Sequence, residues 1–283
     1  MKLGIEDIPF IRLYGAQQGY QTIKAIGYDC VDYQRLCYTD NELYTSGAAA
    51  FERMIKDDYT LIRDCGLEVY QTHGPWRYPP RDGSEEERAE RFEKMSQAIY
   101  ATALMGCKNF VIHPIMPWGV LEQEYQRLFD INVEFMSRLA EVGKQHDVVV
   151  CLENMPMVKF PLSTPEECLK VVRAINTPYL KICLDTGHCA TMQVNPADAV
   201  RMIGKDLLSS MHVHDNDGIG DRHWVPFAGI IDWDDFRNAL QEIAFDGCIS
   251  LETSPAKNYT GKIRKLQDES LYCSARYLAG MEV

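Results

Sequence analysis

The stretch "LKICLDTGHC" at residues 180–189 determines how the rest of the sequence is interpreted. It begins as a short apolar run and then places Asp185 and His188 three residues apart, around a glycine. Short apolar runs bounded by turn signals are typical of buried parallel strands. An aspartate and a histidine at the end of such a run indicate a polar site at the carboxyl end of a strand.

Similar runs recur along the chain and alternate with helical patterns. The alternation in 283 residues predicts an α/β fold, a single (β/α)8 TIM barrel that forms one domain over residues 1–283. A doubly wound sheet is the alternative, but its glycine-rich loop after the first strand is missing. The runs lie at 2–5, 28–33, 67–73, 108–114, 148–155, 180–186, 208–215 and 247–254, and the helical patterns at 48–64, 85–106, 122–146, 164–176 and 259–280.

The composition predicts a soluble protein of the cytoplasm. The net charge of −12 argues against non-specific binding to nucleic acid or to an anionic membrane. No apolar run approaches the roughly 18–20 residues of a membrane-spanning helix. The first ten residues also lack the apolar segment of a secretory signal. Several of the ten cysteines lie inside apolar runs without C-x-x-C spacing, which favours reduced, buried thiols.

Six consecutive predicted strands end in a histidine, an aspartate or a glutamate. The carboxyl ends of barrel strands share one rim, so these side chains should meet there. Burying so many ionisable groups is costly unless a cation compensates them. Mixed carboxylate and imidazole ligands suit manganese, cobalt, zinc or iron, and magnesium less well. The residues are His73, His113, Glu153, Asp185, His214 and Glu252, with His188 after the sixth strand and Asp221 and His223 after the seventh.

The alternation of side chains along a strand predicts which residues face the barrel interior. Residues two apart share a face, so Cys151 lies beneath Glu153 and Cys183 beneath Asp185. By the same spacing, His212 is expected one layer below His214. We therefore expect His212 to support the site from behind or to belong to the core, and not to bind a metal.

Aromatic and basic side chains follow several of these candidate ligands. Trp76, Trp118 and Trp224 could form a lid that packs on the rim, or an apolar wall against a sugar face that also excludes water. Both interpretations stay open. Each basic residue, taken singly, is more simply interpreted as a solvated side chain on the surface. Those that could bind a substrate phosphate are Arg77, Arg81, Lys159, Arg222 and Lys257.

The motifs "LENMP", "CLDTGH", "HVHDND", "DRHWVPFAGIIDW" and "SLE" occur in the order seen in a known family. The sequence resembles the sugar phosphate isomerase/epimerase group of the xylose isomerase-like TIM barrel (AP endonuclease family 2) superfamily. That superfamily includes ketose 3-epimerases, hydroxypyruvate isomerase, inosose dehydratase and, more distantly, endonuclease IV. The resemblance covers strands three to eight and is weaker before residue 65. It is specific for the superfamily and not for a substrate.

This resemblance implies an enzyme with one divalent metal, held by Glu153, Asp185, His214 and Glu252, while His188 hydrogen-bonds a substrate oxygen. The implied reaction is isomerisation or epimerisation of a small sugar, sugar phosphate or polyol ketone through a metal-stabilised enediolate. Glu153 and Glu252 would act as the acid–base pair. Manganese, zinc or cobalt is favoured over iron or magnesium. A dehydratase of the inosose type is a close variant, and a homo-oligomer is expected only by analogy.

A multi-zinc phosphodiester hydrolase similar to endonuclease IV is the alternative, because counterparts of all nine ligands of its zinc cluster are present. In that case His73, His113, His188, Asp221 and His223 would bind further metals. In the isomerase they would serve as second-metal or substrate ligands. The acidic composition argues against a nucleic acid substrate. A metal-stabilised scaffold without catalysis is disfavoured, because a barrel does not need rim carboxylates for stability.

One departure from the family concerns the residue six positions after the first metal glutamate. Ketose 3-epimerases have a second glutamate there that contacts the sugar, whereas this chain has Lys159. The substrate specificity of that group is therefore not carried over.

Overall fold

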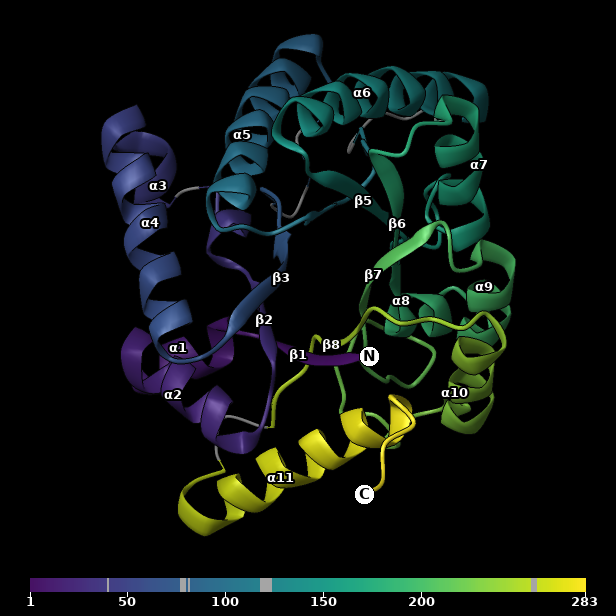
Figure 1. Cartoon of the computed structure of the whole chain (residues 1–283). Helices are drawn as coiled ribbons and strands as arrows, with labels where there is room; N and C mark the ends of the chain where they lie inside the picture. Colours follow the sequence, from purple (N-terminus) through teal and green to yellow (C-terminus); the bar gives the residue numbers. More distant parts are fainter. Residues whose placement is uncertain (40, 77–79, 81, 118–123, 256–258) are drawn as a thin grey trace.

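The computed structural model describes all residues except 40, 77–79, 81, 118–123 and 256–258. Eight strands form one parallel sheet, and the helices surround it (Figure 1). The strands are β1 (Lys2–Glu6), β2 (Cys30–Tyr33), β3 (Glu68–His73), β4 (Asn109–Ile112), β5 (Val149–Glu153), β6 (Leu180–Asp185), β7 (Leu208–His212) and β8 (Cys248–Leu251).

The sheet closes into a barrel between β7 and β8. Along the sheet the order is β7-β6-β5-β4-β3-β2-β1-β8, and each paired neighbour is parallel. Just beyond the end of β7, the N–H of Val213 donates to the carbonyl of Ser250 at 2.9 Å, and the N–H of Glu252 donates to the carbonyl of Val213 at 3.2 Å. This bridge joins the last two strands, and the predicted (β/α)8 barrel is confirmed.

The predicted helices are present, and capping side chains fix the start of two of them. Ser84 and Glu87 form a capping box at α5, and Thr164 and Glu167 form one at α7. The helices over residues 8–14, 16–26, 42–45, 186–191, 196–203 and 233–242 lie outside the predicted helical patterns. The helices are α1 (Ile8–Tyr14), α2 (Ala16–Ile26), α3 (Glu42–Thr45), α4 (Ala48–Asp64), α5 (Glu85–Leu104), α6 (Tyr125–His146), α7 (Pro165–Ile175), α8 (Thr186–Thr191), α9 (Pro196–Ile203), α10 (Trp233–Glu242) and α11 (Gly261–Leu278), with a 3-10 turn at Arg35–Cys37.

Small side chains fill the barrel interior beneath the rim. Val111, Cys151 and Cys183 form a cluster there, separate from the large apolar core between sheet and helices. Nearby, Gly4 leaves room for the thiols of Cys30 and Cys248, which approach to 3.4 Å from the two strands flanking β1. All ten cysteines are free. The interior beneath the rim is therefore packed.

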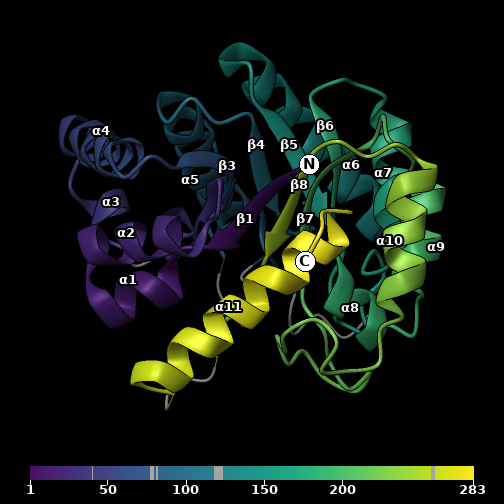
Figure 2. The same ribbon diagram turned by 60° about the horizontal axis from the view of Figure 1, so that its bottom comes forward.

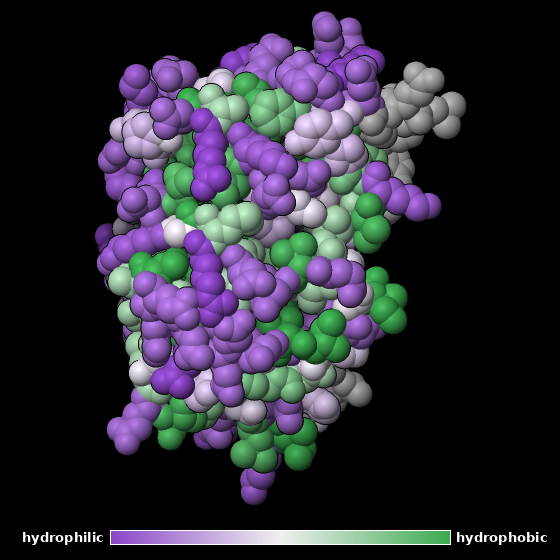
Figure 3. Space-filling view, turned by 90° about the vertical axis from the view of Figure 1, so that its right-hand side faces the viewer, coloured by the Kyte–Doolittle hydropathy of each residue, from purple (hydrophilic) through white to green (hydrophobic). Residues whose placement is uncertain are grey.

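The segments after the strands gather at one end of the barrel. In Figure 2, α1, α8 and the first turn of α11 lie on the side to which the arrowhead of β8 points. Figure 3 shows the face formed by α7, α9 and α10, where hydrophilic side chains predominate. No helix among the described residues is both long and apolar enough to cross a membrane. We therefore expect the functional groups at the carboxyl ends of the strands.

Candidate active site

Glu153, the last residue of β5, lies at the centre of the polar rim. Its carboxylate is only 1% exposed, and four imidazoles surround it. Nδ1 of His212 lies 2.7 Å from Oε1, and Nε2 of His113 lies 3.0 Å from Oε2. His73 and His188 lie slightly farther away, at 3.5 Å and 3.8 Å. Residues from four other strands or strand ends thus converge on one carboxylate.

A first group of possible metal ligands consists of Glu153, Asp185, His212 and Glu252. One ligand atom from each lies within 4.8 Å of the others. Nδ1 of His212 also lies 3.3 Å from the Glu252 carboxylate. The structure thus places His212 beside the carboxylates, whereas the sequence predicted it one layer behind them, and its role as a ligand belongs to the proposal below. The ladder of β7 ends at His212, so this residue, and not His214, is the last inward-facing side chain of the strand.

A buried aspartate orients His212. Nε2 of His212 lies 2.9 Å from Oδ2 of Asp32 on β2, and the side-chain amides of Gln34 and Gln71 donate to the same oxygen. Asp32 therefore holds the proton on Nε2 and leaves Nδ1 directed at the carboxylates. Such a carboxylate behind a histidine fixes the tautomer that binds a metal. Asp32 is not recognisable from the sequence as part of the site, because only the fold brings β2 opposite β7.

Replacing Asp32 with asparagine should weaken metal binding without unfolding the barrel. The amide loses the charge that fixes the His212 tautomer, and such changes typically reduce metal affinity by about 10–100-fold. Calorimetric titration with Zn²⁺ or Mn²⁺ measures the change. Asp29→Asn is the matched control, because Asp29 accepts from the Leu3 N–H at the opposite end of the barrel. Equal affinities of Asp32→Asn and wild type would refute the role of Asp32.

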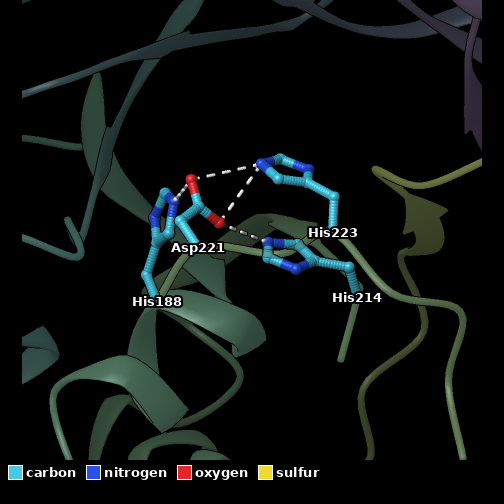
Figure 4. Close-up of side chains that lie close together, drawn as sticks. All are labelled: His188, His214, Asp221 and His223. Atoms are coloured by element: carbon cyan, nitrogen blue, oxygen red, sulfur yellow. Dashed lines mark hydrogen bonds and ion pairs between the residues drawn. The ribbon is translucent and has the colours of Figure 1, made fainter. Parts of the chain in front are cut away.

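A second group consists of His188, His214, Asp221 and His223 (Figure 4). The carboxylate of Asp221 lies 3.4 Å from Nε2 of His188 and 3.2 Å from Nε2 of His223. Nε2 of His214 lies 3.9 Å from the same carboxylate. The rings of His214 and His223 stack with their centroids 4.1 Å apart. Three imidazoles thus point at one carboxylate, an arrangement that also suits a cation.

Backbone carbonyls orient two of these imidazoles. Nδ1 of His188 donates to the Asn154 carbonyl at 2.8 Å, and Nδ1 of His223 donates to the Glu252 carbonyl at 2.8 Å. The Nε2 atom of each ring is then free to face the site. His214 connects the two groups, because its Nε2 lies 3.0 Å from Oδ2 of Asp185. Its assignment to a single metal with the three carboxylates stays a prediction.

A third group consists of His73, His113 and Glu153, which is shared with the first. Nδ1 of His73 donates to the Gly74 carbonyl at 2.9 Å, which turns its Nε2 towards Glu153. The ring of Trp76 packs edge to face on His113, with centroids 4.3 Å apart. Trp76 therefore lies directly against His113, and its role as part of a lid or as a wall against a sugar stays a prediction.

The remaining predicted substrate residues differ in their surroundings. Trp224 is 41% exposed, and its backbone pairs with that of Asp215. Lys159 is exposed, and Arg222 forms an ion pair with Asp217 at 3.0 Å. No described contact brings Lys159 or Arg222 to the three groups. The positions predicted at Trp118, Arg77, Arg81 and Lys257 lie outside the described residues.

The pKa values show how the carboxylates and imidazoles share protons. Burial disfavours the charge on Glu153, but His212 and His113 outweigh it and hold its pKa well below the ordinary value. Burial lowers the pKa of His113 to about 4 despite the Glu153 charge. Burial also opposes the charge on His188, yet Asp185 and Asp221 raise its pKa to about 10. Protonated imidazoles such as His188 therefore neutralise the carboxylates of the site, whereas His113 is uncharged at neutral pH.

Metal binding should therefore release protons and become tighter as the pH rises. Burial opposes the charge on His212, but Glu153 and Glu252 raise its pKa well above the ordinary value, so this ring keeps its protons at neutral pH, whereas a metal binds only a deprotonated ring nitrogen. We expect the affinity of Zn²⁺ to increase between pH 6 and pH 8. Titration calorimetry in buffers of different ionisation enthalpy counts the protons released. An affinity that does not change with pH would contradict this picture.

The loop between β7 and α10 carries Asp221 and His223, and Asp215 holds it in place. Asp215 is fully buried, and its carboxylate accepts from the N–H groups of Gly229 at 2.9 Å and Ile231 at 3.3 Å and from the indole N–H of Trp233 at 2.8 Å. One side chain thus ties both ends of the loop. Sequence analysis did not identify it, because these partners lie 14 to 18 residues away.

Replacing Asp215 with asparagine should loosen this loop. Asparagine keeps one acceptor oxygen, but its NH2 group cannot accept, so the buried N–H donors on the other carboxylate oxygen lose their partner at a cost of about 1–3 kcal/mol each. We expect a lower melting temperature and faster proteolysis within residues 216–232. Asp217→Asn is the control in the same loop, because its partners are more exposed. Equal protection of the loop in both variants would count against the proposed role.

The donor set fits a divalent cation. Oxygen and imidazole nitrogen atoms suit borderline metals such as zinc, cobalt and manganese. Oε2 of Glu153 and Nδ1 of His214 are buried and have no well-aligned hydrogen-bond partner in the described structure. Buried polar atoms are rarely left unpaired, and a metal ligand bond would satisfy Glu153. Metal dependence and the number of ions belong to the proposal below.

Comparison with known proteins places this barrel among its relatives. D-psicose 3-epimerase of Enterocloster bolteae is 30% identical over 241 residues, which cover 81% of this chain and 74% of that protein. An uncharacterised protein of Methanocaldococcus jannaschii is 30% identical over 176 residues, 61% of this chain and 60% of its own length. The solved structure of a D-tagatose 3-epimerase-like protein matches 99% of both chains with a TM-score of 0.79 and 24% identity.

The family comparison covers most of the chain. The model of the xylose isomerase-like TIM barrel family matches residues 20–269. The match includes the strands from β2 to β8 and therefore most residues of the site. The predicted resemblance is confirmed, and the chain belongs to the xylose isomerase-like TIM barrel family.

Proposed function

We propose that the protein is a divalent-metal-dependent isomerase or epimerase of a small sugar, sugar phosphate or polyol ketone. The observation that carries the proposal is the convergence of Glu153 and Glu252 on the same imidazole, His212, from separate strands. Two carboxylates beside one metal site can exchange protons with a substrate bound between them. The relative named D-psicose 3-epimerase, 30% identical to this chain, supports a sugar substrate.

The two carboxylates differ in their affinity for protons. Burial raises the pKa of Glu252, and the charges of His212 and His223 offset this rise only in part. Glu153 remains ionised, because its imidazole neighbours lower its pKa. A bound divalent cation would polarise a substrate carbonyl and an adjacent hydroxyl, which acidifies the C–H bond between them. Glu252 is then the carboxylate that holds a proton more readily, and it is suited to take or return one with Glu153 as its counterpart.

Other residues would orient the substrate and exclude water. His188 is fixed through its Nδ1, so its Nε2 can donate a hydrogen bond to a substrate oxygen as the charge develops. Trp76 would supply an apolar wall beside His113. Epimerisation requires proton removal from one face of a carbon and return on the other. Isomerisation returns the proton to the neighbouring carbon through the same enediolate.

The proposal is tested first by metal content and then by proton exchange. Elemental mass spectrometry of protein purified without added metal or chelator measures the ions per chain. About one ion is expected if the first group acts alone, and two or three if the second and third groups also bind metal. Ketoses are then incubated with the enzyme in D2O and followed by NMR. Deuterium at the carbon next to the carbonyl is expected, and its absence with every ketose would overturn the proposal.

The second and third groups would also suit a multi-zinc hydrolase, but the epimerase named among the relatives favours the isomerase. Phosphodiester cleavage serves as the contrasting assay on the same preparation. An inosose-type dehydratase would instead release water from a polyol ketone in the NMR experiment. The homo-oligomer and the cytoplasmic location expected from the sequence remain predictions.

A further inference from the structure

We propose that a cavity beside the metal site binds a phosphate group carried by the substrate. The inference rests on the proposed function and narrows its substrate class to a phosphorylated ketose. The cavity measures about 240 Å³ and lies between α1, the segment after β8 and α11. Its lining consists of Pro9, Arg12, Leu13, Ser254, Pro255 and Arg264.

The cavity lies next to Glu252. Ser254 lines it and follows Glu252 by two residues, so their Cα atoms lie within about 7 Å of each other. The intervening Thr253 donates its hydroxyl proton to the carbonyl of His223. Figure 2 places α1 and the first turn of α11 on the side where the strands end. A substrate whose reacting carbon lies at Glu252 can therefore extend into the cavity.

Arg264 supplies a buried cation on the wall of the cavity. Its side chain is only 6% exposed, and its Nε donates to both carboxylate oxygens of Asp268 at 2.9 Å and 3.0 Å. The guanidinium carbon lies 5.5 Å from the centre of the Phe10 ring. Its Nη2 is buried and has no hydrogen-bond partner in the described structure. A buried donor without a partner is costly, and an anion in the cavity would compensate it.

Arg12 supplies a second cation at the same cavity. Its Nη2 donates to the hydroxyl of Tyr38 at 3.0 Å, and no carboxylate among the described residues forms an ion pair with it. None of the described lining residues is acidic. Among the described lining residues and their ion-pair partners, two arginines therefore face one carboxylate, Asp268.

The chemistry of the lining favours a phosphate ester over an uncharged sugar terminus. The planar guanidinium group of arginine donates paired, charge-assisted hydrogen bonds to the oxygens of a phosphate. The hydroxyl of Ser254 can add a further donor, and the apolar side chains of Pro9, Leu13 and Pro255 would contact the carbon atoms that carry the phosphate. The volume of about 240 Å³ accommodates a phosphate with the adjoining carbons. Arg12 and Arg264 were not identified by sequence analysis, because 252 positions separate them.

Binding of inorganic phosphate tests the site without depending on turnover. Calorimetric titration of the chelator-treated full chain is expected to show binding that Arg12→Gln weakens by about tenfold or more, since a charge-assisted hydrogen bond contributes about 1.5–3 kcal/mol. Arg12 is exposed, so this variant should fold. The same titration of Arg264→Gln is a second test of the site, provided that circular dichroism shows that this variant folds. Arg173→Gln on α7 is the matched control, because Arg173 is an exposed arginine far from the cavity.

The metal-loaded enzyme connects the site to catalysis. With a ketohexose 6-phosphate, Arg12→Gln should raise KM about tenfold or more and leave kcat nearly unchanged, whereas KM for the free ketohexose should not change. Phosphate binding that is absent, or equal in wild type and Arg12→Gln, would overturn the site. Phosphate binding that depends on Arg12, without turnover of any ketose or its phosphate, would preserve the site and overturn the proposed function instead.

Discussion

Replacing Glu153 with glutamine should abolish metal binding and turnover together. Glu153 belongs to the first and the third group, and four imidazoles approach its carboxylate within 4 Å. The amide removes the central negative charge and turns an N–H group towards at least one of these rings. We expect metal affinity to fall by at least about 100-fold and turnover by about four orders of magnitude, because proton transfer and metal binding are lost at once.

Glu252→Gln is the informative comparison for Glu153→Gln. Glu252 lies at the edge of the first group, 3.3 Å from Nδ1 of His212, and does not belong to the third. Its replacement should reduce turnover by about 10²–10⁴-fold through loss of proton transfer, with a smaller loss of metal. Elemental analysis and deuterium exchange separate the two effects. Full metal content in Glu153→Gln, or wild-type exchange in Glu252→Gln, would refute the corresponding assignment.

Replacing Gly187 with alanine should break the second group apart. A Cβ atom at this position would lie 2.0 Å from the imidazole of His214. That ring cannot simply move aside, because His223 stacks against it at 4.1 Å with planes only 5° apart. The clash should displace His214, reduce the free energy of unfolding by about 1–3 kcal/mol and remove any metal held with Asp221.

Thermal unfolding and metal content measure this effect. Gly83→Ala is the control, because the nearest atom to its added Cβ is a carboxylate oxygen of Glu87 at 3.5 Å. If Gly187→Ala keeps the stability and metal content of wild type, then the second group is either metal-free or formed without His214. Loss of one ion from a preparation that contained two or three would assign that ion to the second group.

Local sequence patterns were sufficient to predict the barrel. Its strands are short apolar runs, and helices such as α5 and α7 carry their start signals in Ser84 and Thr164. The missed pair α1 and α2 is interrupted by Gly15, whose φ of 77° ends one helix and begins the next. Each of these helices is too short for its apolar periodicity to be recognised in the sequence. The remaining boundaries differ because capping and fraying depend on neighbouring elements.

The sequence predicts which strand ends carry the residues of the candidate site, but it does not predict how these residues are arranged in space. The sequence "HVH" places His212 and His214 on the same face, but it does not say where the ladder of β7 ends. That end is determined by Val213, which leaves β6 and pairs with β8. Asp32 and Arg12 were missed for a related reason. Their partners lie on elements distant in the sequence, and no local pattern records them.

The hydrogen bonds of His223 to the segment after β8 have a mechanical consequence. The loop before α10 is attached to Glu252 and Thr253 through His223, whose Nδ1 donates to one carbonyl and whose own carbonyl accepts from the Thr253 hydroxyl. Lifting this loop to admit a substrate would therefore pull on the backbone of Glu252, the proposed acid–base residue. Opening of the loop and displacement of the Glu252 backbone are thus expected to occur together.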